Sequence, residues 1–262
     1  MNESELATML HRLVAGEVNI HHAISQLKNT IFRTTELGFA RPDHHRELRL
    51  GLSEVIYGQN KTIKQIIQIA LPLSEQQRCI LISRLNAKKL SALKNQFPKD
   101  RANEIAGTFM INAPAILPVE VDKKFVAIIS AGTSDIHIAE EASEVCVAMK
   151  IPVQPIYDVG VAGLHRVLAS MEIMQKAAVI IVIAGMEGAL PSVIGGLIGC
   201  PVIAVPTSIG YGTSFQGIAA LLGMLNSCAP GVVVTNIDAG FSAGFAAARI
   251  VNGINRHENS LS

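Results

Sequence analysis

The sequence contains no tryptophan, and aromatic residues make up only 4% of its 262 residues. Its core must therefore be built from aliphatic side chains, which are plentiful because hydrophobic residues account for 49% of the chain. Charged residues are also few, at 16%, and the net charge is +1 at pH 7. A chain with so little excess positive charge lacks the basic surface of a nucleic-acid-binding protein, so we expect no nucleic-acid partner.

Cysteine is scarce as well, and the four residues are far apart in the chain: Cys79, Cys146, Cys200 and Cys228. No C-x-x-C pair occurs, so neither a zinc knuckle nor a disulfide framework is predicted. Free thiols fit a reducing compartment, and we therefore expect a cytoplasmic protein. The acidic start, Met1–Glu5, lacks the apolar segment of a signal peptide.

The chain also lacks a long unbroken hydrophobic run. The stretch from Ala177 to Val205 has membrane-like hydropathy, but five glycines and two prolines divide it: Gly185, Gly188, Pro191, Gly195, Gly196, Gly199 and Pro201. Short pieces of this kind predict a strand, a loop, a helix and a second strand. We therefore expect no membrane span.

Charge is unevenly distributed along the chain. Residues 1–122 hold 15 Lys/Arg and 12 Asp/Glu, whereas residues 123–262 hold 7 and 9. Between Ala177 and Ile237 the one formal charge is Glu187, which follows an apolar run. Because burying an unpaired carboxylate is costly, a charge kept there is a candidate functional group. The alternative is a glutamate at the start of a helix, where backbone amides would satisfy it.

The polar first part, residues 1–122, is predicted to be a helical domain followed by a linker. Apolar residues recur at helical spacing over Lys61–Ala70 and again over Ser74–Leu93, where Ser74 would be the N-cap and Gln77 would complete a capping box. Prolines punctuate Phe97–Asp122, which we interpret as the linker.

Residues 123–254 are predicted to form an α/β domain. Continuous Val/Ile runs alternate with helical segments, which is typical of a parallel sheet covered on both faces. Five such units predict a flavodoxin-like, doubly wound sheet, with ligands bound at the carboxyl ends of the strands. The expected strands are Phe125–Ser130, Val153–Tyr157, Ala178–Ile183, Val202–Val205 and Val232–Thr235.

Polar motifs follow four of these strands. Ser130–Asp135 offers small hydroxyl residues that suit an anion or serve as an ordinary helix cap. Tyr157–Arg166 gathers Asp, His and Arg, and its arginine could hold a phosphate or carboxylate. The third motif surrounds Glu187. Pro206–Ser214 contains G-x-G, but Phe215 stands where a Rossmann fingerprint needs glycine or alanine.

A fifth candidate motif, Leu225–Cys228, follows the helix after the fourth strand. Isolated cysteines are usually inert core residues, and Cys79, Cys146 and Cys200 fit that interpretation. Cys228 instead follows two polar residues in a predicted turn, where an exposed thiolate would be a nucleophile.

Taken together, these motifs resemble two related families. The first is PurE, the aminoimidazole ribonucleotide carboxylase/mutase. The second and fuller resemblance is to LarB, a nickel-pincer cofactor biosynthesis enzyme with a PurE-like C-terminal domain. It extends over residues 35–252 and is carried by Ala131–Asp135, Tyr157–Arg166, Gly185–Pro191, Pro206–Gly212, Leu225–Cys228 and, in the first part, Arg46–Arg49, Glu54–Gly58 and Lys61–Thr62. The sequence departs from PurE at Val167–Leu168, where a Thr-Pro pair is usual.

The resemblance implies a pyridinium-3,5-biscarboxylic acid mononucleotide synthase. Such an enzyme carboxylates the pyridinium ring of nicotinic acid adenine dinucleotide and hydrolyses its phosphoanhydride, releasing AMP. It would need one nucleophile and one acid/base in a dry site, and Cys228 and Glu187 match these roles. Asp135, His165 and Arg166 would bind the phosphates or a metal, and Asp135 and His165 also count as candidate catalytic residues.

The same resemblance gives the remaining expectations. Carbon dioxide or bicarbonate is the co-substrate, Mg²⁺ is a candidate cofactor, no nickel is expected to be bound, and the assembly is a homo-octamer. The predicted substrate-binding residues, besides Arg166, come from the same motifs: Gly132, Thr133, Ser134, Asp158, Gly160, Gly163, Gly185, Met186, Gly188, Ala189, Thr207, Ser208, Gly210, Tyr211, Gly212, Asn226 and Ser227.

The same sequence is compatible with two other functions. A PurE-type purine enzyme would move a carboxylate on aminoimidazole ribonucleotide, with His165 as the acid/base and Cys228 dispensable. A nucleotide-binding module without catalytic activity would bind the dinucleotide tightly and leave it unchanged.

Overall fold

The computed structural model describes residues 3–31, 38–40, 46, 51–52, 54–75, 78–120 and 123–261. The chain forms two compact units: Met1–Ala102 with Phe109–Ala113, and Asn103–Thr108 with Pro114–Ser262. The charged LarB-like motif at residues 46–49 lies outside the described residues apart from Arg46.

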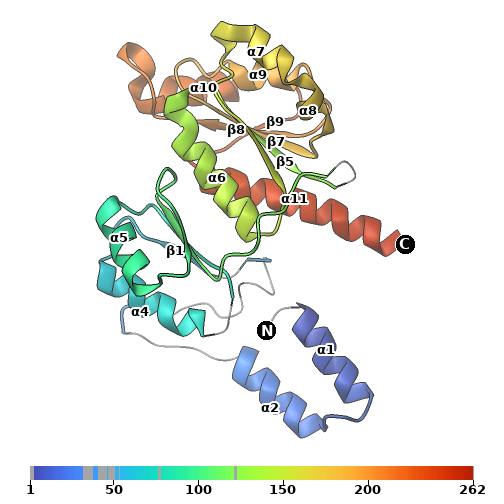
Figure 1. Ribbon diagram of the computed structural model, residues 1–262. Coiled ribbons are helices and arrows are strands. Elements are labelled where there is room, and N and C mark those ends of the chain that lie inside the picture. The colour runs from blue at the N-terminus through green and yellow to red at the C-terminus, as the bar shows by residue number, and fades with distance from the viewer. Residues whose placement is uncertain are drawn as a thin grey trace. The chain divides into compact units, whose positions relative to one another are not determined.

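The first unit begins with two helices, α1 (Glu3–Val14) and α2 (Ile20–Ile31), which form a hairpin (Figure 1). The small core of this hairpin is made by Met9 and Ala23. A four-stranded sheet follows, in the order β1-β2-β4-β3. Its strands are β1 (Val55–Tyr57), β2 (Ile80–Ser83), β3 (Arg101–Asn103) and β4 (Thr108–Ile111).

This sheet corrects the prediction that residues 1–122 are only helices and a linker. The predicted helix Ser74–Leu93 is wrong, because Ile80–Ser83 is strand β2, paired with β1 on one side and β4 on the other. A short buried apolar run cannot be assigned to helix or strand by periodicity alone. Likewise, the predicted linker Phe97–Asp122 contains β3 and β4.

The helices of this sheet begin at other caps than predicted. Helix α4 (Ile63–Ser74) is capped by Thr62, which forms a capping box with Gln65. Ser74 therefore ends a helix instead of starting one, and Gln77 lies outside the described residues. Helix α5 (Ala87–Gln96) starts at Asn86, whose side chain accepts a hydrogen bond from the Lys89 amide.

The second unit contains a five-stranded sheet in the order β6-β5-β7-β8-β9. All four strand pairs are parallel. This order is that of a flavodoxin-like doubly wound sheet, which confirms the predicted fold. The strands are β5 (Val126–Ser130), β6 (Val153–Ile156), β7 (Val179–Ala184), β8 (Val202–Pro206) and β9 (Val232–Val234).

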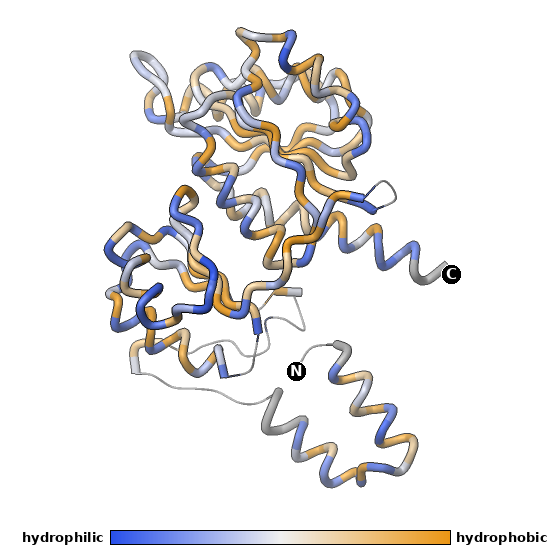
Figure 2. The backbone as a smooth tube through the Cα atoms, in the orientation of Figure 1, coloured by the Kyte–Doolittle hydropathy of each residue, from blue (hydrophilic) through white to orange (hydrophobic). Residues whose placement is uncertain are grey.

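Helices cover both faces of this sheet. Helices α6 (Ile136–Ala148) and α11 (Gly240–Leu261) pack on each other over one face (Figure 1). The other face carries α7 (Leu164–Ala169), α8 (Met171–Lys176), α9 (Leu190–Gly195) and α10 (Ile218–Leu225). Figure 2 shows the hydrophobic strands running through the middle of this unit.

Two local differences from the predicted helices matter for the candidate site. The expected helix near Gly163–Gln175 is divided into α7 and α8. Helix α10 starts at Ile218 instead of Ser214, because Phe215 and Gln216 adopt left-handed backbone angles with φ of 45° and 53°.

Within the described part of the chain, no helix is long and apolar enough to cross a membrane.

Candidate active site

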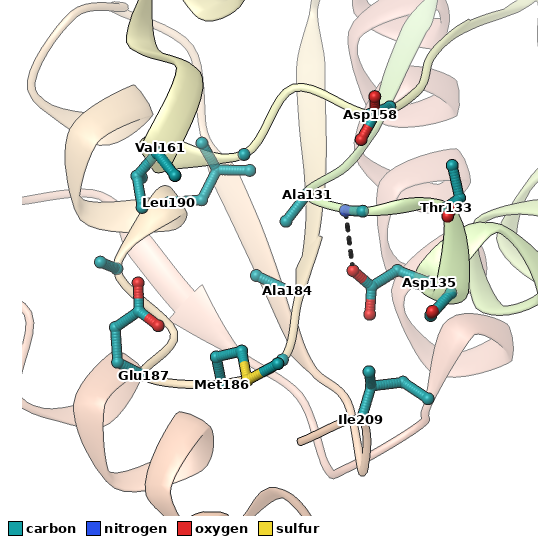
Figure 3. A pocket seen from close by; sticks show the side chains of 16 residues that line it. Ala131, Thr133, Asp135, Asp158, Val161, Ala184, Met186, Glu187, Leu190 and Ile209 are labelled. Carbon is teal, nitrogen blue, oxygen red and sulfur yellow. Dashed lines mark hydrogen bonds between the residues drawn. The ribbon is translucent and has the colours of Figure 1, made fainter. Parts of the chain in front are cut away.

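A cavity of about 360 Å³ lies at the carboxyl ends of the strands. Strands β5 and β7 are neighbours, but the chain visits β6 on the far side of β5 between them. The loops after β5 and β7 therefore diverge to opposite faces, which opens the crevice where doubly wound sheets bind ligands. The cavity is lined by the turns after β5, β6 and β7 and by Ile209 from the loop after β8 (Figure 3).

Asp135 forms the firmly held wall of this cavity. Its side chain is 4% exposed, the Thr207 hydroxyl donates a hydrogen bond to Oδ1 (2.7 Å), and the Gly132 amide donates to Oδ2 (3.0 Å). Burial raises the pKa of Asp135 above its ordinary value, although both hydrogen bonds act in the opposite direction. The result is a pre-positioned carboxyl group that holds its proton more readily than a free aspartate.

Glu187 lies on the opposite side of the cavity, as Figure 3 shows, and its environment is very different. In the single chain Glu187 is exposed to solvent, so the dry surroundings expected from the uncharged sequence around it are not present there. The loop that carries Glu187 packs tightly against neighbouring backbone. A Cβ atom at Gly185 would lie 2.3 Å from the carbonyl oxygen of Ile209, and Gly188 has a φ of +67°. The backbone carrying Glu187 therefore requires glycine on both sides.

Asp158 and Arg166 form an ion pair at the edge of the site, with 2.5 Å between Oδ2 and Nη1. Asp158 lines the cavity and Arg166 does not. The residue before Asp158 is anchored, because the Tyr157 hydroxyl donates a hydrogen bond to Glu140. Burial is the main reason that the pKa of Tyr157 is raised, with a further contribution from the Glu140 carboxylate.

Cys228 is an exposed free thiol in the turn after α10. It does not line the cavity that contains Glu187. Three residues later, the carbonyl of Gly231 accepts a hydrogen bond from the amide of Val202, at the start of β8. Helix α10 has therefore carried the chain from the carboxyl ends of the strands toward their amino ends before the thiol appears.

The predicted site residues therefore divide into two groups. One group lines the cavity: Gly132, Thr133, Ser134, Asp135, Asp158, Gly160, Gly185, Met186, Glu187 and Ala189. The other is not part of its lining: Gly163, His165, Arg166, Gly188, Thr207, Ser208, Gly210, Tyr211, Gly212, Asn226, Ser227 and Cys228. Of the second group, Thr207 is connected to the cavity because its hydroxyl donates a hydrogen bond to Asp135. The backbone amide of Ser208 donates a hydrogen bond to the Asp238 side chain.

Sequence reasoning missed the apolar lining of the cavity, namely Ala131, Val161, Ala162, Ala184, Leu190 and Ile209. Five of them lie inside the polar motifs and Ala184 directly precedes one, which is the signal that could have identified them. Among the described residues, no group of three or more His, Cys, Asp or Glu side chains gathers where a metal ion could bind.

Both parts of the chain match known family models. Residues 34–113 match the LarB/PurE-like N-terminal domain, and residues 125–260 match the AIR carboxylase model. The chain belongs to the AIR carboxylase family. As a LarB-like member with a PurE fold it is a carboxylase-type enzyme by family.

Two curated proteins are similar to this LarB-like chain. An uncharacterized protein of Methanocaldococcus jannaschii is 39% identical over 244 residues, covering 90% of this chain and 92% of that protein. A probable N5-carboxyaminoimidazole ribonucleotide mutase of Methanothermobacter thermautotrophicus is 33% identical over 136 residues, covering 49% of this chain and 38% of that protein. Among solved structures, a PurE2 variant of Treponema denticola matches with a TM-score of 0.40 and 19% identity, covering 53% of this chain and 92% of that one.

Proposed function

We propose that the protein carboxylates the pyridinium ring of nicotinic acid adenine dinucleotide and hydrolyses its phosphoanhydride, releasing AMP. The observation that carries the proposal is an exposed free thiol, Cys228, on a PurE-fold domain that is joined to a LarB-type N-terminal domain. Moving a carboxylate on an imidazole needs no thiol, whereas activating an electron-poor pyridinium ring needs a nucleophile.

The proposed chemistry assigns one step to each group. The Cys228 thiolate adds to C4 of the ring, and the resulting dihydropyridine has an enamine carbon at C5 that attacks carbon dioxide. Glu187 then removes the C5 proton, the electron pair restores the aromatic ring, and the thiolate leaves. The exposed position of Glu187 at the cavity leaves this carboxylate free to approach a bound ring.

The nucleotide phosphates would bind at the turn after β5. The Thr133 and Ser134 side chains are exposed there and line the cavity, and the Asp158–Arg166 pair supplies a guanidinium at its edge. Both oxygens of Asp135 already accept hydrogen bonds, so Asp135 offers no ready ligand for Mg²⁺. A magnesium ion would be held mainly by substrate phosphates and water, and we expect no bound nickel.

A single chain does not bring Cys228 and Glu187 to the same cavity, and its surface suggests how they would meet. Helix α10 and the loop before it expose large apolar side chains: Tyr211, Phe215, Ile218, Leu222 and Leu225. An apolar stripe of this size next to the thiol is expected to be covered in an assembly. We propose that copies pack there in a homo-octamer, so that Cys228 of one chain serves the cavity of a neighbour.

The direct test is incubation of the purified protein with nicotinic acid adenine dinucleotide and bicarbonate, followed by chromatography. AMP and a dicarboxylated mononucleotide are the expected products, and their absence would overturn the proposal. A Cys228→Ser variant should form neither. If that variant kept full activity, the covalent mechanism would be excluded even though the fold would stand.

The second candidate is a PurE-type purine enzyme. It is favoured by the match of residues 125–260 to the AIR carboxylase model. Turnover of aminoimidazole ribonucleotide by the wild type and by Cys228→Ser alike would support it. Tight dinucleotide binding without any product would instead indicate a binding module.

A further inference from the structure

Helix α9 connects the Glu187 loop to the Cys228 turn. It begins directly after that loop, at Leu190. Two residues later, the Ser192 hydroxyl donates a hydrogen bond to the hydroxyl oxygen of Ser227 (2.7 Å), the residue before Cys228. One turn further along the helix, a Cβ atom at Gly195 would lie 3.1 Å from the Cβ of Ala229, the residue after Cys228.

The hydroxyl of Ser227 is fully used as an acceptor. It accepts from Ser192 and also from the Ala229 amide, at 3.2 Å. A hydroxyl oxygen has two lone pairs, so both are used here and only the Ser227 proton remains for a further partner. That Ser227 binds substrate stays a prediction, and its two hydrogen bonds give it a structural role as well. The hydrogen bonds fix the two residues on either side of Cys228, and the thiol itself stays exposed.

Helix α10 also packs closely against the Glu187 loop. A Cβ atom at Gly223 on α10 would lie 2.5 Å from the carbonyl oxygen of Glu187, so helix and loop are in direct backbone contact. The Glu187 loop thus rests on α10, α9 leaves that loop, and Ser192 on α9 holds the turn that ends α10. These contacts link the Glu187 loop, α9, the Cys228 turn and α10 into one closed set.

We propose that Ser192 is a positioning residue, which orients the Cys228 turn through Ser227 so that the thiol is presented in one geometry. This inference rests on the proposed role of Cys228 as the nucleophile. Ser192 does not touch the reacting atoms. Its loss would leave Ser227 and the Ala229 amide to reorganise, and a misplacement of about 1 Å can cost roughly 100-fold in rate.

The test compares three variants with the wild type. Ser192→Ala should lower kcat about 10- to 100-fold while KM stays within about twofold, because binding at the cavity is untouched. Ser192→Thr keeps the hydroxyl and should restore kcat to within about threefold of the wild type. Ser170→Ala is the control, because it removes a half-buried hydrogen bond from a serine hydroxyl to the Arg166 carbonyl, away from the Cys228 turn.

Hydrogen–deuterium exchange of peptides covering residues 226–230 provides a readout that needs no substrate. Exchange should become faster in Ser192→Ala but not in Ser192→Thr or Ser170→Ala. Unchanged kcat in Ser192→Ala, or unchanged exchange, would overturn the positioning role. If the wild type forms no product, the proposed function fails. In that case, faster exchange in Ser192→Ala would still show that Ser192 orders the Cys228 turn. Unchanged exchange would show that Ser192 does not order the turn either.

Discussion

Two carboxyl groups face the same cavity from opposite walls, and they are held in opposite ways. Asp135 is 4% exposed and both of its oxygens accept hydrogen bonds. Glu187 is exposed, and its position is set by the backbone of a glycine-rich loop. Different environments give two carboxyl groups different tasks. In the proposed mechanism, Asp135 organises the wall of the cavity and Glu187 transfers the proton.

The largest expected effect separates these two roles. Glu187→Gln should reduce product formation about 10³-fold, because general acid/base catalysis contributes roughly 10²- to 10⁴-fold. Its thermal midpoint should not change, since the side chain is exposed. Assays with nicotinic acid adenine dinucleotide and a thermal melt check both statements, and retained activity would return Glu187 to the role of a helix-start residue.

A second variant tests whether the loop holds Glu187 in place. Gly185→Ala would put a methyl group 2.3 Å from the Ile209 carbonyl oxygen and 2.7 Å from the Thr207 hydroxyl. Overpacking of this kind costs roughly 1–3 kcal/mol, and we expect a lower denaturation midpoint together with weaker activity. Gly199→Ala is the matched control, because a Cβ there meets no atom within 4 Å.

Asp135→Asn tests the opposite wall. The amide group of asparagine has one oxygen and can accept only one of these two hydrogen bonds, so keeping the bond from the Gly132 amide forces the Thr207 hydroxyl to turn and accept from the amide nitrogen. We expect a loss of roughly 1–3 kcal/mol in unfolding free energy by urea titration. If Asp135→Asn were as stable as the wild type, the structural role of Asp135 would be wrong.

The pH dependence of stability gives a smaller effect with a definite sign. Because the folded pKa of Asp135 is raised, the folded state binds its proton more tightly than the unfolded chain does. Stability from this group is present below the unfolded pKa of about 3.8 and is lost as the pH rises through the raised folded value. Urea titrations across the acidic range should show this decline in the wild type and a flatter profile in Asp135→Asn.

The smallest expected effect concerns the Asp158–Arg166 pair. Both side chains are about half exposed, so Arg166→Ala should change unfolding free energy by less than about 1 kcal/mol. Substrate affinity should fall more clearly if the guanidinium binds phosphate, which isothermal titration can measure. Equal affinity in both proteins would remove Arg166 from the binding site.

The sequence predicted the second unit better than the first. Continuous Val/Ile runs such as Val179–Ala184 are typical of buried parallel strands when they alternate with helical segments. All five strands of this unit were anticipated within two residues at either end. Strand β2 was missed because Ile80–Ser83 is as apolar as a buried helix turn. The late start of α10 was missed because left-handed angles at Phe215 and Gln216 have no signature in residue type.

The candidate site could be predicted in part from the expected parallel sheet. Parallel strands end at one edge, so the motifs after β5, β6 and β7 could be expected to meet, and they do. The position of Cys228 depends on the length and direction of α10, which motif spacing does not reveal. Sequence alone therefore paired Cys228 with Glu187 without showing that Cys228 is not among the residues lining the cavity.

Coexpression of Cys228→Ser and Glu187→Gln chains tests the central claim most directly. Each variant alone should be inactive. In mixed assemblies, about a quarter of the sites would combine Glu187 of one chain with Cys228 of another, since each partner is intact half of the time. The account predicts that mixed assemblies regain a corresponding share of wild-type activity. Mixed assemblies that stay inactive, next to an active wild type, would contradict a site shared between chains.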